Sequence, residues 1–206
     1  MKVIAFNGSP KRDGVVKKGL EIMAGELEKE GIATEIVEVG GEAIRGCVDC
    51  RKCRELGRCV FNDDMVNGCA EKAKAADGVI LGSPVYYGGI AGTMKSFLDR
   101  LFFPGLRLDG KAGVAVASLR RSGGVDTFHQ LNNYLHLGRA VIVPTIYWSV
   151  IHGESPGELA QDLEGLQIME AEGRNMAWLL KALALGKREL PPLPELRRVY
   201  TNFVRQ

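Results

Sequence analysis

The chain has 206 residues, of which 46% are hydrophobic and 25% are charged, and its formal net charge is +2. These values are ordinary for a soluble globular protein, and the length suits one domain or one domain with an insertion. The weak net charge gives no broad electrostatic case for binding nucleic acid or a membrane surface. The chain has neither the apolar start and cleavage site of a signal peptide nor an apolar run of the roughly 20 residues that span a membrane. We therefore expect a cytoplasmic protein.

The first 39 residues alternate between strand and helix patterns. Residues 2–6 form a short apolar run rich in Val and Ile that ends at the turn residues Asn7-Gly8-Ser9-Pro10, which predicts a buried strand followed by a loop. Apolar residues then recur with helical spacing over residues 15–29, and Gly31 ends the predicted helix. Residues 32–39 return to strand character. A strand, helix and strand of these lengths form a βαβ unit, which predicts a parallel sheet.

Residues 40–64 interrupt this rhythm and are too long for an ordinary connection. Four cysteines with the spacing C-x2-C-x2-C-x5-C lie in this stretch, at Cys47, Cys50, Cys53 and Cys59. The short steps let the sulfurs converge on one point, and such sets hold iron–sulfur clusters or zinc in reducing compartments and form disulfides in oxidising ones. A secreted disulfide framework would spread its cysteines, so we expect a reduced set. The residues themselves leave a cluster, zinc and free redox thiols open.

The rest of the chain continues the alternation of strands and helices. Asp64 is a candidate cap for a helix over residues 65–76, and Cys69 within that helix is predicted to be a small buried hydrophobe. The further predicted elements are a strand at 78–82, a loop at 83–89, a helix at 91–103, a strand at 111–118, a loop at 119–124, a helix at 127–137, a strand at 140–146 and a helical pattern from 156 to 185. Pro144 suggests an edge position or a bend in the last strand.

Five strands alternating with helices predict a doubly wound α/β sheet. We expect one domain over residues 1–186, with a cysteine-rich insertion at 40–64 between the second and third strands, and an extended tail over 187–206. Ligands of such sheets bind outside the carboxyl ends of the strands. Three chemically rich loops, at residues 7–16, 83–89 and 118–124, are predicted to meet there.

These loops fit different parts of one ligand. The first has backbone N–H groups, a helix N-terminus and the side chains of Ser9, Lys11 and Arg12 to bind an anion. The second has two adjacent tyrosines for a flat ring, and the third has a pair of arginines near the same rim. The first loop also fits a plain turn. The two tyrosines of the second also fit core positions, and the two arginines of the third also fit solvated surface positions. Together they predict a phosphorylated planar cofactor such as FMN.

Three motifs carry a resemblance to a known family. The stretches GSPKRDG, GSPVYYGGIAGTMKSFLDR and the later GG are similar to the NAD(P)H-dependent FMN reductase group of flavodoxin-like proteins, over roughly residues 1–150. The resemblance implies a flavodoxin-like five-stranded parallel sheet, with the phosphate of FMN in the first loop and its ring between the other two. The residues implied to bind FMN are Ser9, Lys11, Arg12, Val16, Pro84, Val85, Tyr86, Tyr87, Gly88, Ser118, Arg120, Gly123 and Gly124. One departure is Val15-Val16, where the family usually has Asn-Thr, so a hydroxyl donor to the phosphate is missing.

The cysteine set, followed by Asp63-Asp64-Met65, resembles the iron–sulfur flavoproteins of anaerobic archaea and bacteria. That subgroup implies a 4Fe–4S cluster on the four cysteines and electron flow between a ferredoxin-like donor or NAD(P)H and an acceptor, in a homodimer or tetramer. We expect an FMN-dependent oxidoreductase with the insertion close to the flavin, and with Arg120 and Arg121 as candidates for steering an acidic donor. We assign no catalytic acid or base. Two alternatives stay open, an FMN or quinone reductase without a cluster and a flavodoxin-like binding protein with structural zinc.

Overall fold

The central strands have apolar side chains on both faces. In β1 (Lys2–Asn7), Val3 and Ala5 pack with one buried cluster, whereas Ile4 and Phe6 pack with another. The same division continues through β3 (Gly78–Tyr86) and β5 (Ala112–Leu119). A parallel sheet that is apolar on both faces must be covered by helices on both faces.

The computed structural model describes residues 1–192, 194, 199 and 201. Its sheet has the order β2-β1-β3-β5-β6, with every pairing in that series parallel. β2 is Ala33–Glu38 and β6 is Val141–Ile142. This is the strand order of flavodoxin-like sheets, in which the direction of winding reverses beside the first strand. The predicted doubly wound α/β fold is therefore confirmed.

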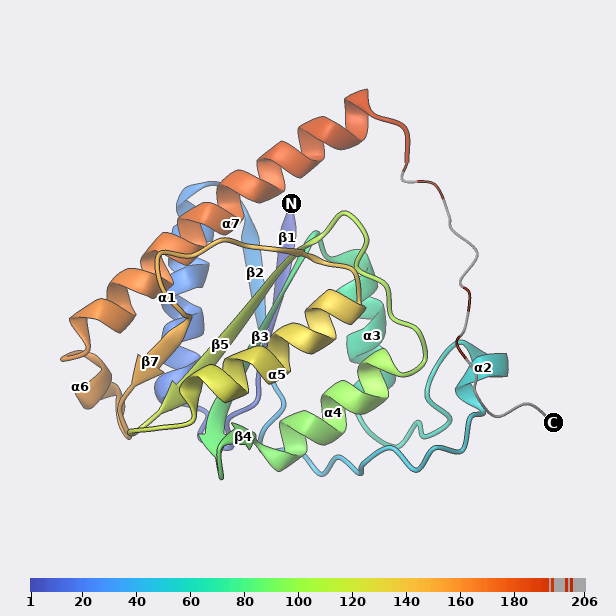
Figure 1. The fold of residues 1–206 in the computed structure, drawn as a ribbon, viewed down its shortest axis with the longest axis horizontal. Helices are drawn as coiled ribbons and strands as arrows, with labels where there is room; N and C mark the ends of the chain where they lie inside the picture. Colours follow the sequence, from blue (N-terminus) through green and yellow to red (C-terminus); the bar gives the residue numbers. More distant parts are fainter. Residues whose placement is uncertain (193, 195–198, 200, 202–206) are drawn as a thin grey trace.

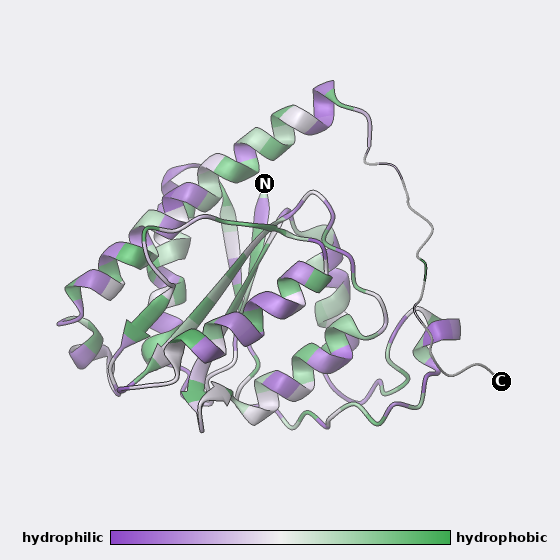
Figure 2. Ribbon diagram, viewed as in Figure 1, coloured by the Kyte–Doolittle hydropathy of each residue, from purple (hydrophilic) through white to green (hydrophobic). Residues whose placement is uncertain are grey.

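Helices cover both faces of this sheet (Figure 1). α1 (Val15–Lys29), α6 (Pro156–Leu159) and α7 (Leu163–Glu189) lie on one face, with α1 packed along α7. α3 (Val66–Ala75), α4 (Gly92–Phe102) and α5 (Gly124–Leu137) cover the other. Figure 2 shows hydrophobic strands in the centre and helices that carry both hydrophilic and hydrophobic residues. Such two-sided helices bury one stripe against the sheet.

The predicted loop at 83–89 differs in the structure, because β3 continues through it to Tyr86. The chain then turns at Tyr87 and Gly88 and returns as β4 (Gly89–Ile90), antiparallel to β3. Tyr87 has a φ of 51° and Gly88 a φ of 75°. Two successive left-handed residues match the twist of a tight hairpin, which explains why a glycine stands at the second position.

The predicted strand at 140–146 is also different. Only Val141–Ile142 form β6, and the chain leaves the sheet before Pro144. It rejoins as β7 (Val150–His152), which pairs in parallel with the carboxyl end of β5. The edge position expected from Pro144 is confirmed, but the second contact with β5 was not predicted.

The ends of several elements shift from their predicted positions. α5 begins at Gly124, and α7 continues to Glu189, beyond the predicted domain end at 186. Most of the predicted tail falls at 193, 195–198, 200 and 202–206, outside the described residues. None of the helices in the described part of the chain has the length and apolar character needed to cross a lipid bilayer.

Glu172 of α7 is a buried acid without a hydrogen-bond partner for its Oε2 atom among the described residues. Burial raises the pKa of this carboxyl from 4.5 to about 8, and the nearby Ser149 opposes that rise. The folded protein therefore holds an extra proton between these two pH values. The stability that this proton provides is present at low pH and is lost as the pH rises through 8.

We predict that Glu172→Gln flattens the dependence of stability on pH. Between pH 5 and pH 8 the parent chain should lose up to roughly 1.4 kcal/mol of unfolding free energy per pH unit that the variant does not lose. Urea unfolding at a series of pH values measures the difference. Glu170→Gln, at a partly exposed position of the same helix, should keep the parent slope. Equal slopes for the parent and the Glu172 variant would contradict the prediction.

Candidate functional site

The first loop is held by Asn7, the last residue of β1. Its Oδ1 accepts the N–H of Ser9 at 3.0 Å, and its amide donates to Glu38 of β2 at 2.7 Å. Its carbonyl accepts the N–H groups of Val39 and Gly40 at 2.8 and 3.0 Å. Sequence reasoning treated Asn7 only as a turn residue, because its partners on β2 lie some thirty residues away.

The backbone of residue 40 presses against the same loop. A Cβ atom at Gly40 would lie 2.2 Å from the carbonyl carbon of Ser9 and 2.4 Å from the carbonyl oxygen of Gly8. Only glycine permits so close an approach. The Ser9 hydroxyl accepts the N–H of Lys11 at 3.2 Å, which turns the loop toward the start of α1. The loop is therefore shaped by contacts on both sides.

The loops at the carboxyl ends of β1, β3 and β5 line one cavity of about 370 Å³. Its walls are Ser9, Lys11, Val15, Pro84, Val85, Tyr86, Ser118, Leu119, Arg120, Gly153 and Glu154. The three loops predicted to meet at this edge do so. The N-terminus of α1 is at the cavity through Val15, which provides helix N–H groups and a positive dipole end for an anion.

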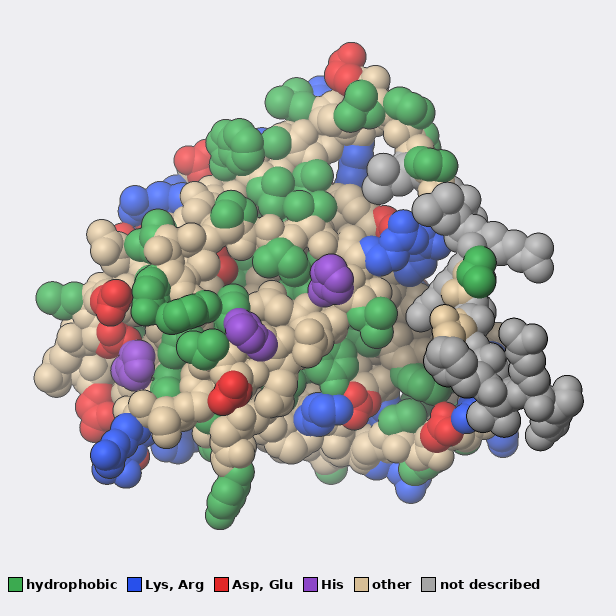
Figure 3. Space-filling view, in the orientation of Figure 1, with side chains coloured by type: hydrophobic (Ala, Val, Ile, Leu, Met, Phe, Trp, Pro, Cys, Tyr) green, Lys and Arg blue, Asp and Glu red, His purple; other side chains and the backbone are tan. Residues whose placement is uncertain are grey.

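Several predicted cofactor residues lie outside this wall. Arg12 is exposed, with its guanidinium 4.0 Å from Glu42. Val16 is buried and packs against Gly82, so it contributes to the core. Tyr87 is fully exposed at the tip of the β3–β4 hairpin, where a hydrophobic side chain projects from the lower edge of Figure 3. Gly88 shares that turn.

The glycine pair of the third loop lies in an adjoining cavity of about 340 Å³, which shares Leu119 with the first. A Cβ atom at Gly123 would lie 3.0 Å from Val85 and from Gly88, so this loop and the hairpin pack against each other. Gly124 begins α5. Both glycines therefore border the predicted ring-binding region without lining the cavity of about 370 Å³.

Two wall residues were missed by sequence reasoning, Gly153 and Glu154. They follow β7, whose pairing with β5 brings them to the cavity. Glu154 lies 3.3 Å from the Arg120 guanidinium, so part of the positive charge on this rim is neutralised. No local pattern marks these residues, because β7 is only three residues long.

All four clustered cysteines line a second cavity. The other wall residues are Val48, Arg51, Val60, Phe61, Arg100, Phe103 and Pro104, so the wall contains no carboxylate or imidazole. Asp49 and Arg51 adopt left-handed φ values of 47° and 60°, which turn the chain between the cysteines. Cys53 then begins the single turn α2 (Cys53–Leu56). Thiolate-only sites suit soft metals such as zinc and iron–sulfur clusters.

The four thiols surround this cavity without meeting at one point. Cys47 and Cys50 are exposed, whereas Cys53 and Cys59 are buried. Burial raises the pKa of the Cys53 thiol, and the other three thiols raise it further. Across the described residues, no three Cys, His, Asp or Glu side chains form a group arranged to hold a single metal ion. The predicted convergence on one point is therefore not observed.

The remaining sulfur and imidazole groups lie apart from this cavity. All five cysteines are free thiols, so the disulfide alternative is not observed. Cys69 is buried in α3, and burial raises its thiol pKa to about 11, as expected for a small hydrophobe. The histidine side chains are separated from one another in Figure 3.

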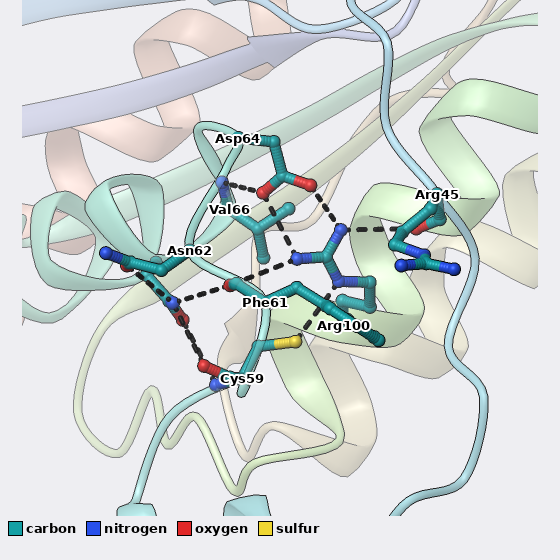
Figure 4. Close-up of polar contacts among 8 residues, drawn as sticks. Arg45, Cys59, Phe61, Asn62, Asp64, Val66 and Arg100 are labelled. Carbon is teal, nitrogen blue, oxygen red and sulfur yellow. Dashed lines mark hydrogen bonds and ion pairs between the residues drawn. The ribbon is translucent and has the colours of Figure 1, made fainter.

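Arg100 of α4 holds the thiol segment from inside the protein (Figure 4). Its side chain is 1% exposed, and its Nε donates to the Sγ of Cys59 at 3.2 Å. The same guanidinium forms an ion pair with Asp64 and donates to the carbonyl of Arg45 at 3.2 Å. Burial by itself would lower the pKa of Arg100, but its bonds to Asp64 and Cys59 outweigh burial and raise it. The buried guanidinium of Arg100 therefore contacts Arg45, Cys59 and Asp64, which all lie between residues 45 and 64.

Two residues complete this attachment. Asp64 also accepts the N–H of Val66, the first residue of α3, at 3.1 Å, but the N-cap of this helix is Met65 and not the expected Asp64. Asn67 of α3 accepts the Cys59 N–H at 3.1 Å and donates to the Cys59 carbonyl at 3.0 Å. Sequence reasoning missed both Arg100 and Asn67, because neither has a local pattern that predicts a contact with Cys59.

The residues that line the two cavities lie toward opposite ends of α4. The hairpin that borders the first precedes this helix, and Arg100, Phe103 and Pro104 at its other end line the second. The eleven residues of α4 rise about 16 Å. Gly46 approaches Ser96 of this helix, so the chain follows α4 from the first loop toward the thiols. The insertion was expected beside the flavin loops, but the thiols lie beyond the helix.

Comparisons with known proteins find similar sequences over most of the chain. The family model described as NADPH-dependent FMN reductase matches residues 1–155. An iron-sulfur flavoprotein from Methanocaldococcus jannaschii is 34% identical over 196 residues, covering 89% of this chain and 99% of the relative. An iron-sulfur flavoprotein from Methanosarcina thermophila is 30% identical over 148 residues, covering 69% of this chain and 77% of the relative.

Solved structures share the fold at low sequence identity. RosB with a bound 8-demethyl-8-formylriboflavin-5'-phosphate has a TM-score of 0.70 and 16% identity, covering 99% of this chain and 93% of that one. A flavodoxin from the domain Archaea has a TM-score of 0.58 and 15% identity, covering 88% of this chain and 99% of the flavodoxin. These similarities show a flavodoxin-like fold.

We predict that Arg100→Met destabilises the chain by about 3 kcal/mol, because the mostly buried Asp64 would lose its cationic partner. Urea unfolding measures the loss. Arg100→Met combined with Asp64→Leu should recover part of it, since the unpaired carboxylate is then removed. A single variant as stable as the parent, or a double variant that sums both losses, would show that the ion pair is unimportant.

Proposed function

The chain belongs to the NADPH-dependent FMN reductase family and is a flavin-dependent oxidoreductase, and we propose that it is an iron–sulfur flavoprotein that passes electrons between a donor and an acceptor through FMN and a 4Fe–4S cluster. The observation that carries the proposal is the cavity walled by all four clustered cysteines and by no carboxylate or imidazole. Relatives named iron-sulfur flavoproteins match most of the chain, which supports the same conclusion.

FMN fits the cavity at the carboxyl edge of the sheet. Ser9, Lys11 and the N-terminus of α1 would bind its phosphate, since a helix N-terminus and a cation both favour an anion. Residues 84–86 and 118–120 would flank its ring and exclude water from one side. The flavin takes two electrons as hydride or one at a time, whereas a cluster carries one at a time. We assign no protein acid or base to this site.

The thiol cavity would hold the cluster through Cys47, Cys50, Cys53 and Cys59. Arg100 donates a hydrogen bond to the Cys59 sulfur, and such bonds are among the features that set the reduction potential of a cluster. Four thiolates can hold zinc as well, so metal analysis distinguishes the two.

The donor is proposed to be a ferredoxin-like protein or NAD(P)H, and the assembly a homodimer or tetramer. The edge of the sheet at β6 and the following loop support an assembly of several copies, because apolar side chains are exposed along them. These side chains are Val141, Ile142, Ile146, Tyr147 and Trp148. Contiguous exposed apolar surface of this kind is typical of contacts between proteins.

Anaerobic purification followed by metal and flavin analysis tests the proposal. We expect one FMN and about four irons per chain, with broad absorbance beneath the flavin bands. Cys59→Ala should lose iron and retain FMN, because the two sites share no wall residue. Cys69→Ala, which removes a thiol outside both cavities, should retain both. Flavin without iron in the parent would instead identify an FMN or quinone reductase, and stoichiometric zinc without flavin would identify a binding protein.

We also predict that Gly40→Ala weakens FMN binding at least tenfold, on the order of 1.4 kcal/mol, because the added methyl would displace the backbone of the first loop. Fluorescence titration of the flavin-free protein measures the affinity. Gly41→Ala is the matched control, since the nearest atom to its added methyl is 3.9 Å away. Iron content should be unchanged in both. An unaltered affinity in the Gly40 variant would show that this contact does not shape the flavin site.

A further inference from the structure

The segment that carries the thiols is strongly basic. Between residues 45 and 58 it has five cations and two carboxylates, an excess of three positive charges in a chain whose net charge is only +2. We call the five cations the basic rim, and all of them are exposed. They are Arg45, Arg51, Lys52, Arg54 and Arg58.

Little of this charge is neutralised locally. Arg51 pairs with Asp49 at 3.1 Å, and Arg45 stacks over the ring of Phe61 at 4.2 Å. In the part of the chain that the structure describes, Lys52 and Arg54 have no acidic partner. Their charges are therefore available to a molecule that approaches the thiols.

Exposed apolar side chains, here called the apolar centre, lie in the same segment and at the end of α4. Val48 is 56% exposed, Leu56 49% and Phe103 51%, and the first and last of these line the thiol cavity itself. Cys47 and Cys50 are exposed between them. An apolar centre within a charged rim is the usual composition of a protein interface, and a small one suits a short-lived complex.

The flavin cavity has a different electrostatic character. Arg120 on its wall lies 3.3 Å from Glu154, whereas Lys11 on the same wall serves the anion site. Arg120 and Arg121 were the residues expected to steer an acidic donor. The segment around the cysteines, beyond the other end of α4, has an excess of three positive charges instead.

We propose that the basic rim and its apolar centre form a docking surface for a small acidic protein that carries single electrons. This inference rests on the proposed function, because it names the partner of the thiol site. Opposite charges steer two proteins together and raise their association rate by about 10- to 1000-fold at low ionic strength. The apolar centre favours a protein over a nucleic acid, whose binding would depend mainly on phosphate contacts.

The double variant Lys52→Glu with Arg54→Glu tests this surface in the holoprotein. Stopped-flow measurement gives the second-order rate at which it oxidises a reduced acidic bacterial ferredoxin over a range of ionic strengths. We expect a parent rate that falls with salt, and a rate at least tenfold lower at low salt in the variant. The matched control is Lys181→Glu with Arg188→Glu, which changes the same charge on α7, away from the thiols (Figure 1). It should stay within twofold of the parent.

A second reagent separates docking from redox competence. Reduced methyl viologen, a small cation, should reduce all three proteins at similar rates. Gallium-substituted ferredoxin transfers no electrons, so its binding, measured by NMR line broadening, reports docking even if metal analysis finds no iron and the proposed function fails. The inference is overturned if the variant binds and reacts like the parent, if the control loses as much, or if a short DNA duplex binds the rim more tightly than ferredoxin.

Discussion

The register of the three central parallel strands determines where this chain can bind ligands. Asn7 of β1 pairs with Gly82 of β3, and Pro84 of β3 pairs with Ser118 of β5, so the loops that follow emerge at one edge. A shift of one residue would turn the apolar side chains of a strand to the opposite face, and both faces are already buried. The cavity at the carboxyl edge is therefore a consequence of core packing.

α4 connects this edge to the thiols. It begins beside the hairpin that borders the first cavity and carries Arg100 in its last turn, buried against the cysteine segment. A buried guanidinium is tolerated only with good partners, and these come from Asp64, Cys59 and Arg45. Most residues of the thiol segment are exposed, so the segment has little hydrophobic core of its own. The contacts of Arg100 hold it against the rest of the protein instead.

The two cavities therefore differ in what can reach them. The flavin cavity is lined by loops from the strand ends, and its arginine has a carboxylate beside it. The thiol cavity opens on a surface with exposed thiols, apolar side chains and excess positive charge. The first suits a small ligand with an anionic group and a flat ring, and the second suits contact with another protein. With FMN at the first site and a protein partner at the second, as proposed, ligand chemistry and protein contact would be separate.

The sequence by itself predicted the features that depend on neighbouring residues. A short apolar run and helical spacing predicted β1 and α1, and the cysteine spacing predicted a single thiol site, because burial and short turns are local properties. The tertiary structure decided what depends on distant partners. Arg100 meets Cys59 across 41 residues, and Glu154 reaches the flavin cavity only because β7 pairs with β5. Packing along α4 likewise placed the thiols away from the flavin loops, since no spacing of cysteines specifies which surface the segment will follow.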